Sequence, residues 1–191
     1  MNFSRYSNDI SINLKDNCIK LLTNNSSEYE IVLCDTGLDS KTGKRVKIAS
    51  RYVDSPCFFL TYGDGLADID INKLFAEHIK SQKNMTLTRV KNPARFGLIE
   101  VDDTGNISNF REKNISDGYI NGGFMVVNKD FIEKYLDDSD VFFEQEPIDA
   151  AIKMKDVYAY THNGFWQCMD NPKEYEYLNS LWKTGNAPWK I

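Results

Sequence analysis

The apolar run Cys57-Phe58-Phe59-Leu60, which stops at Gly63-Asp64-Gly65, limits what this chain can fold into more than any other feature. A short apolar run bounded by glycines is typical of a buried strand. Residues 68–82 then follow with the apolar periodicity of an amphipathic helix, in which Leu74 and Phe75 share one face. A buried strand followed by a helix is the unit of an open α/β sheet, where ligands lie outside the carboxyl ends of the strands. Asp64 is therefore placed to hold Mg²⁺, although an ordinary strand-to-turn Asp-Gly is the alternative.

Strand and helix patterns alternate along the rest of the chain and predict an α/β fold of one domain over residues 1–191. Further strands are expected at 10–14, 29–33, 85–90, 119–127 and 156–161. Further helices are expected at 45–53, 129–137, 146–154 and 172–183. The segments 96–101 and 107–110 flank the turn 103–106 and predict an inserted β-hairpin.

Composition excludes several classes of function. The net charge is −5 and no basic stripe runs along any segment, which argues against a nucleic-acid surface but leaves small polyanionic substrates possible. The four cysteines are scattered and only two histidines are present, so a zinc site is not expected and the thiols are predicted to be free and mostly buried. The amino terminus does not resemble a signal peptide and no segment is long and apolar enough to span a membrane, which favours the cytoplasm.

The polar loop from Thr36 to Arg45 has the composition of a phosphate-binding loop but not its spacing. Five residues separate Gly37 from Gly43 where a Walker A loop has four, and Arg45 stands where Ser or Thr would meet Mg²⁺. The loop leads into a predicted helix, whose first N–H groups attract anions. A polar turn with a helix cap is the alternative.

Three further segments carry candidate binding residues. Glu112 and Lys113 end the predicted hairpin, where Glu112 could bind sugar hydroxyls and Lys113 a phosphate. The alternative is that both are solvated residues at the end of a strand. Asn121-Gly122-Gly123 interrupts an apolar strand, which indicates either close approach of another group to the backbone or a β-bulge. Asp170 ends an aromatic run, where it could share a cation with Asp64 or simply cap the last helix.

Taken in order, these segments resemble the sugar-1-phosphate nucleotidyltransferases. The shared motifs are Asp-Thr-Gly…Thr-Gly-x-Arg, Tyr-Gly-Asp-Gly-x-Ala-Asp, Arg-Phe-Gly, Glu-Lys, Asn-Gly-Gly-Phe, Glu-Gln-Glu-Pro and Gly-Phe-Trp-Gln-x-Met-Asp. The Tyr-Gly-Asp-Gly form, the Gly-Phe-Trp-Gln segment and the closing 181–190 favour the branch of glucose-1-phosphate cytidylyltransferases. The resemblance runs from about residue 35 to the end.

The resemblance implies a Rossmann-like α/β fold that joins α-D-glucose 1-phosphate to CTP, releasing pyrophosphate and CDP-glucose, a nucleotide sugar of the kind used for lipopolysaccharide O-antigen. It implies Mg²⁺ as cofactor, a cytoplasmic homo-oligomer, and no nucleic-acid or membrane partner. The catalytic residues implied are Asp64, Lys113 and Asp170, of which Asp64 and Asp170 would hold the metal. The substrate-binding residues implied are Thr36, Gly37 and Arg45 toward the nucleotide, and Gly97, Glu112, Lys113, Asn121, Gly122, Glu146 and Trp166 toward the sugar phosphate.

Two departures from the family pattern affect these expectations. The family's Glu-Lys-Pro reads Glu112-Lys113-Asn114, which keeps both chemical groups. The 191 residues contain no counterpart of the family's opening strand and Gly-x-Gly-Thr-Arg loop, which grip the CTP phosphates. We therefore expect the C-terminal part of a nucleotidyltransferase domain without its N-terminal strand-loop-helix unit. Unpaired backbone and exposed apolar surface on neighbouring strands should result, with weak CTP binding and slow turnover.

Three functions stay open at this point. The first is synthesis of CDP-glucose. The second is transfer from dTTP or UTP to the same sugar phosphate. The third is a non-catalytic protein that binds sugar phosphate or assembles with a complete copy.

Overall fold

The computed structural model describes residues 9–23, 30–91, 98–101, 107–111 and 118–190. The chain divides into two compact units, 1–35 and 36–191, and each is described by itself. The expectation of one domain over the whole chain stays a prediction.

The first unit contains a hairpin of two antiparallel strands, β1 (Ile10–Asn13) and β2 (Cys18–Leu21). The side chains of Asn13 and Asp16 accept hydrogen bonds from backbone N–H groups of the turn, which is how these residue types stabilise tight turns. The predicted strand at 10–14 is confirmed.

The strand predicted at 29–33 is wrong over 30–33, where the backbone is irregular. Ile31 and Leu33 are 73% and 76% exposed. An apolar run becomes a strand only where a neighbouring strand accepts its hydrogen bonds, and among the described residues none lies beside this one.

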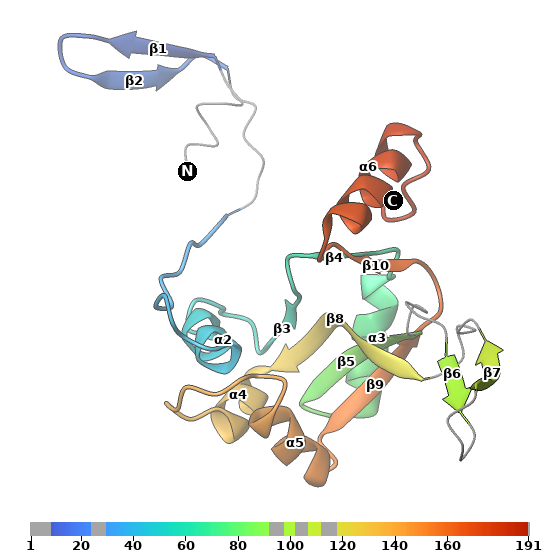
Figure 1. The fold of residues 1–191 in the computed structure, drawn as a ribbon. Coiled ribbons are helices and arrows are strands. Elements are labelled where there is room, and N and C mark those ends of the chain that lie inside the picture. Colours follow the sequence, from blue (N-terminus) through green and yellow to red (C-terminus); the bar gives the residue numbers. More distant parts are fainter. Residues whose placement is uncertain (1–8, 24–29, 92–97, 102–106, 112–117, 191) are drawn as a thin grey trace. The chain divides into compact units, whose positions relative to one another are not determined.

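The second unit is built on a four-stranded mixed sheet in the order β3-β8-β5-β9 (Figure 1). Its strands are β3 (Cys57–Leu60), β8 (Tyr119–Asn128), β5 (Met85–Lys91) and β9 (Val157–His162). β8 runs antiparallel to both of its neighbours, whereas β5 and β9 are parallel. β3, β5 and β9 therefore all end at the same edge of the sheet. The predicted α/β fold with a central sheet is confirmed, and the sheet is mixed rather than wholly parallel.

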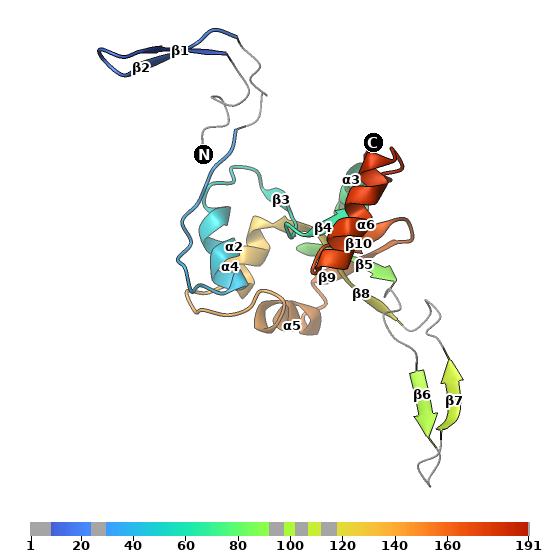
Figure 2. The ribbon, with the colours of Figure 1, turned by 45° about the horizontal axis from the view of Figure 1, so that its top comes forward.

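The helices of the second unit are α2 (Thr42–Ser50), α3 (Ile71–Ser81), α4 (Lys129–Tyr135), α5 (Glu146–Lys153) and α6 (Pro172–Lys183). Helix α3 covers one face of this sheet and α4 and α5 cover the other (Figure 2), while α2 packs against α4 and α6 stands apart from the sheet (Figure 1). Successive β8 residues point to opposite faces. Met125 and Val127 join a core with residues of α4 and α5, while Val126 packs with Leu74 of α3. Among the described residues, no helix has the length and apolar character needed to cross a membrane.

Helix boundaries follow their capping residues. The Asp70 side chain accepts from the N–H groups of Asn72 and Lys73, so α3 begins later than the predicted residue 68. Helix α6 has the predicted bounds, because Asn171 caps it and Pro172 follows. Helix α2 begins and ends three residues before the prediction of 45–53.

The apolar face predicted for α3 is only partly buried. Leu74 is fully buried, but Ile71, Phe75 and Ile79 are 51%, 38% and 57% exposed. His78 takes the second buried position, one turn after Leu74, where its ring nitrogens lie within hydrogen-bond distance of Thr86 and Asn128. The apolar periodicity correctly predicted that Leu74 is buried, but it did not predict that His78, rather than Phe75 or Ile79, faces the sheet with it.

Phe75 instead packs beside Phe59 of β3, which is 51% exposed. Within the described chain β3 is an edge strand that pairs only with β8.

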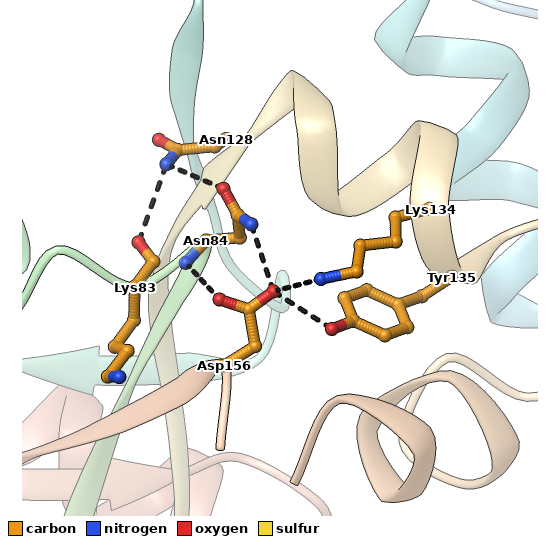
Figure 3. A network of polar contacts seen from close by, with 6 residues as sticks. All are labelled: Lys83, Asn84, Asn128, Lys134, Tyr135 and Asp156. Atoms are coloured by element: carbon orange, nitrogen blue, oxygen red, sulfur yellow. Dashed lines mark hydrogen bonds and ion pairs between the residues drawn. The ribbon is translucent and has the colours of Figure 1, made fainter. Parts of the chain in front are cut away.

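The edge of the sheet where β5 and β9 begin is held by a polar network centred on Asp156 (Figure 3). Asn84 donates to both oxygens of the Asp156 carboxylate, and Tyr135 and Lys134 donate to Oδ2 at 2.8 and 3.2 Å. Asn128 joins through the Asn84 side chain. Burial by itself would raise the pKa of Asp156, but the hydrogen bonds from Asn84, Tyr135 and Lys134 outweigh it and lower the pKa to about 2.

Two small ladders complete the second unit. The predicted hairpin is confirmed as β6 (Leu98–Val101) and β7 (Ile107–Arg111), which pair antiparallel. The antiparallel ladder of β4 (Gly65–Ala67) and β10 (Trp166–Cys168) was not predicted. The four cysteines are free as expected, but only Cys168 is buried and Cys18 is exposed, so the prediction that most are buried is wrong.

Candidate functional site

The candidate residues gather at the edge where β3, β5 and β9 end. Tyr62 and Asp64 follow β3, and β9 ends at His162 before the chain enters β10. Because β8 runs the opposite way, its first residues, with Asn121 and Gly122, lie at the same edge. This is the place where an open α/β sheet binds ligands.

The backbone of the β4–β10 ladder places Asp64 and Asp170 at the same end. Gly65 pairs with Cys168, and the Met169 backbone N–H donates to the Asp64 carbonyl oxygen at 2.9 Å. Asp170 is the next residue, and both aspartates are exposed. The alternative in which Asp170 caps α6 is wrong, because Asn171 is the capping residue. Two carboxylates from distant segments therefore share one end of a ladder, and their oxygens are the ligands that Mg²⁺ prefers.

Glu174 is a third acidic residue at this end that the sequence did not indicate. Its Oε2 accepts from the Asp170 backbone N–H at 2.7 Å. Ligand atoms of Cys168, Asp170 and Glu174 lie within 4.8 Å of one another. A thiolate is a poor ligand for Mg²⁺, so the sulfur does not belong to a site of that kind. The spacing Asn171-x-x-Glu174 is a capping-box pattern and could have revealed that Glu174 turns back toward this end of the helix.

A wide β-bulge shapes the middle of the site. Leu87 pairs with Met125 and Arg89 with Asn121, so residues 122–124 of β8 lie opposite Thr88 alone. The Thr88 hydroxyl donates to the Phe124 carbonyl at 2.7 Å. The bulge alternative is thus correct.

Other atoms also approach Gly122 and Gly123 closely, and they belong to side chains of the protein itself. A Cβ on Gly122 would lie 2.7 Å from Val90 Cγ1, and one on Gly123 would lie 3.1 Å from Tyr62 Cδ2. Gly123 also has φ of +71°, a conformation that favours glycine.

Two side chains fix the bulge from either side. The Trp166 indole N–H donates to the Gly122 carbonyl at 2.8 Å, which ties β10 to β8. The Asn121 side chain accepts from the Gly123 N–H at 3.0 Å and donates to the Tyr62 hydroxyl at 3.4 Å. Asn121, Gly122 and Trp166, all predicted site residues, are therefore in one cluster.

Glu144 links this cluster to α2. Its Oε1 accepts from the Tyr62 hydroxyl at 2.7 Å and its Oε2 from the Thr42 hydroxyl at 2.8 Å. Burial and, after it, the Glu144 carboxylate raise the pKa of Tyr62 above its usual value of 10. The predicted Glu146 is instead an exposed residue in the first turn of α5. The sequence Glu-Gln-Glu-Pro contains no signal that distinguishes Glu144 from Glu146 as the site residue.

The loop before α2 is organised by Arg45. Its guanidinium donates to the carbonyls of Ser40 and Leu38 and to the Thr36 hydroxyl at 2.7 to 2.8 Å. Thr36, Gly37 and Arg45 are therefore brought together as one polar turn, in which Gly37 has φ of +86°. The N-cap residue Lys41 donates its backbone N–H to Asp140, and Gly43 in the first turn donates to the Val141 carbonyl. The choice between an anion site and a polar turn stays a prediction.

The family is decided by comparison with known proteins. The family model described as nucleotidyl transferase matches residues 22–181. The chain belongs to the nucleotidyl transferase family. A glucose-1-phosphate cytidylyltransferase of Salmonella typhi is 37% identical over 191 residues, which cover 99% of this chain and 74% of that protein. A probable glucose-1-phosphate cytidylyltransferase of Bacillus subtilis is 35% identical over 85% of this chain and 64% of its own length.

Solved structures agree on the nucleotidyl transferase fold. HddC from Yersinia pseudotuberculosis matches with a TM-score of 0.52 and 23% identity, over 72% of this chain and 60% of that one. A putative glucose-1-phosphate thymidylyltransferase from Bacillus anthracis matches with a TM-score of 0.54 and 12% identity, over 76% and 62% of the two chains. This nucleotidyl transferase thus spans about three fifths of the length of those structures, and at such identities they show the fold alone.

Three predicted site residues of this nucleotidyl transferase lie outside the described residues. They are Gly97, Glu112 and Lys113. Their assignment to the sugar phosphate stays a prediction.

Proposed function

We propose that this nucleotidyl transferase is a glucose-1-phosphate cytidylyltransferase, which makes CDP-glucose and pyrophosphate from CTP and α-D-glucose 1-phosphate. The observation that carries the proposal is the 37% identity to the Salmonella enzyme along the whole chain. The gathering of the motif residues at one edge of the sheet supports it.

In the proposed reaction a phosphate oxygen of glucose 1-phosphate attacks the α-phosphorus of CTP. A new P–O bond forms, the bond from the α-phosphorus to the bridging oxygen breaks, and pyrophosphate leaves with that electron pair. Nothing is oxidised or reduced, so the protein has to hold the reactants in line and balance their negative charge.

We assign Asp64 and Asp170 to a Mg²⁺ ion that would neutralise phosphate charge. The exposed carboxylates at the end of the β4–β10 ladder suit a hard cation that keeps part of its water and shares phosphate oxygens. Lys113 is proposed to contact the sugar phosphate and Glu112 the sugar hydroxyls.

We place the glucose beside the β8 bulge, against Asn121, Gly122 and Trp166. Glu144 replaces Glu146 as the proposed carboxylate of this pocket, because Glu144 reaches Tyr62 and through it Asn121. The Tyr62 hydroxyl donates to Glu144, which leaves the tyrosine oxygen as an acceptor.

The nucleotide side of the proposal rests on the family resemblance. Thr36, Gly37 and Arg45 are proposed to face the nucleotide. Contact of Arg45 with a phosphate would require it to exchange at least one of its hydrogen bonds within the loop. A cytoplasmic homo-oligomer and a role in O-antigen synthesis are proposed on the same ground.

A nucleotide panel tests the proposal. Glucose 1-phosphate and Mg²⁺ are supplied with CTP, dTTP, UTP or GTP, and pyrophosphate release and the nucleotide sugar are measured. We expect CDP-glucose from CTP. A faster reaction with dTTP or UTP would replace the cytidylyl assignment. Binding of glucose 1-phosphate by calorimetry without turnover with any nucleotide would support the non-catalytic alternative.

A further inference from the structure

A buried histidine and a carboxylate meet just outside the residues assigned above. His162 is the last residue of β9 and is 9% exposed. Its Nε2 lies 2.9 Å from Asp68 Oδ1 and 3.1 Å from the Phe165 carbonyl oxygen. Because both neighbours of Nε2 are acceptors, Nε2 carries a proton.

The backbone closes around this contact. The Asp68 N–H donates to the same Phe165 carbonyl at 3.2 Å. Gly164 fits between the two side chains, since a Cβ there would clash with Asp68 Oδ1 and lie 2.8 Å from His162 Cε1. The turn 162–165 is thereby fastened to Asp68, one residue beyond β4.

The turn 162–165 leads directly into β10, which carries residues of the candidate site. Phe165 is followed directly by β10, which carries Trp166 and pairs with β4. Trp166 holds the Gly122 carbonyl of the bulge, and the far end of the same ladder holds Asp64 next to Met169. A shift of β10 against β4 would therefore move the proposed sugar pocket and the proposed metal ligands together.

We propose that Asp68 and His162 are a positioning pair that fixes how β10 pairs with β4. Through β10, the pair would fix the positions of Trp166 and Asp170. The proposal rests on the proposed function for its effect on the reaction. Neither residue is assigned contact with substrate.

A role in packing alone explains the pair less well. Asp68 Oδ1 is a buried oxygen without a well-directed hydrogen bond among the described residues, because the Nε2–H points better at the Phe165 carbonyl. Because the Asp68 side chain as a whole is 35% exposed, its contact with His162 adds little to the overall stability of the fold. Its effect is local, and it fixes the turn that leads into β10.

The test compares Asp68→Ala, His162→Ala and His162→Gln with the unchanged chain. Hydrogen exchange of the Trp166 indole N–H is followed by ¹H–¹⁵N NMR and assigned with Trp166→Phe. We expect exchange to rise about tenfold or more in the two alanine variants, because the hydrogen bond to Gly122 opens locally. His162→Gln keeps an N–H that can reach the Phe165 carbonyl and should restore much of the protection. The Trp182 indole, which is 55% exposed, serves as the internal reference and should not respond.

A second readout uses the reaction. The alanine variants should raise the Mg²⁺ concentration for half-saturation, or lower kcat/KM for glucose 1-phosphate, by roughly 10- to 100-fold, the range found for groups that orient a ligand. Asp70→Ala is the matched control, because it removes the cap of α3 two residues away and does not touch β10. It should lower the melting temperature without changing the Trp166 exchange.

The two readouts separate the possible failures. Unchanged Trp166 exchange in both alanine variants, or an equal rise in Asp70→Ala, would overturn the positioning role. Absence of turnover in the unchanged chain would count against the proposed function, while the indole measurement would still decide whether the pair holds β10.

Discussion

Replacing Asp156 by asparagine should destabilise the fold in a way that depends on pH. Asp156 accepts four hydrogen bonds, two from Asn84 and one each from Tyr135 and Lys134, and its side chain is 13% exposed. Asparagine has the same shape, but its NH₂ group would meet donors where a carboxylate oxygen now accepts. The variant therefore loses the charge and also leaves donors without a partner.

The size of the effect follows from the pKa of Asp156, which falls from 3.8 to about 2. Each unit corresponds to about 1.4 kcal/mol, so the ionised carboxylate contributes at most about 2.5 kcal/mol at neutral pH. Since the pKa is lowered by folding, this contribution is complete well above pH 3.8 and is lost as the pH falls toward 2.

Urea unfolding followed by circular dichroism at pH 7, 5, 4 and 3 measures the effect. The difference in free energy of unfolding between the unchanged chain and Asp156→Asn should be about 2 kcal/mol at pH 7 and should shrink between pH 5 and pH 3. Asp138→Asn removes an aspartate whose side chain is 92% exposed and serves as control, with little change at any pH. A difference that stays constant from pH 7 to pH 3 would refute the assigned pKa, and no difference at pH 7 would refute the network's contribution.

Four further substitutions address the site. Asp64→Asn and Asp170→Asn should each reduce Mg²⁺-dependent nucleotidyl transfer by about 100-fold or more while the melting temperature stays within a few degrees, and retained activity in either would remove that residue from the metal site. Folding raises the pKa of Tyr62, so the protonated phenol stabilises the fold below pH 10, and this stabilisation is lost as the pH rises further. Tyr62→Phe should therefore reduce the fall in the free energy of unfolding above pH 10, as measured by urea unfolding. An identical pH profile in the variant would contradict this. Gly122→Ala should lower the free energy of unfolding in urea by about 1–3 kcal/mol, because the new Cβ meets the stiff Val90 side chain. Gly63→Ala is the control, because its Cβ would point into open space and should change the stability little. Equal effects of the two variants would show that the backbone of the bulge moves to accommodate the Cβ.

Local signals predicted much of the fold. The glycines after β3 and the Asn171-Pro172 start of α6 each act within a few residues, and the elements they mark are present. Their success is expected, because capping and turn chemistry depend on neighbouring backbone.

The failures share a different cause. The run at 30–33 looks like a strand but has no partner among the described residues, and the β4–β10 ladder exists only because two distant three-residue segments meet. The stripe of α3 that faces the sheet was likewise decided by Thr86 and Asn128, far along the chain. Each outcome depends on a tertiary contact that periodicity does not contain.

The two edges of the sheet are held in different ways, which separates stability from function in this protein. At the edge where β5 and β9 begin, Asp156 satisfies several donors at once and its effect is on the free energy of unfolding. At the opposite edge the candidate site depends on a three-residue ladder, a bulge and single hydrogen bonds from Trp166 and Tyr62. Contacts this few can shift by a fraction of an ångström without unfolding the sheet. Substitutions of the exposed carboxylates Asp64 and Asp170 at the carboxyl edge should therefore change binding and turnover before they change the melting temperature, and variants around Asp156 should do the reverse.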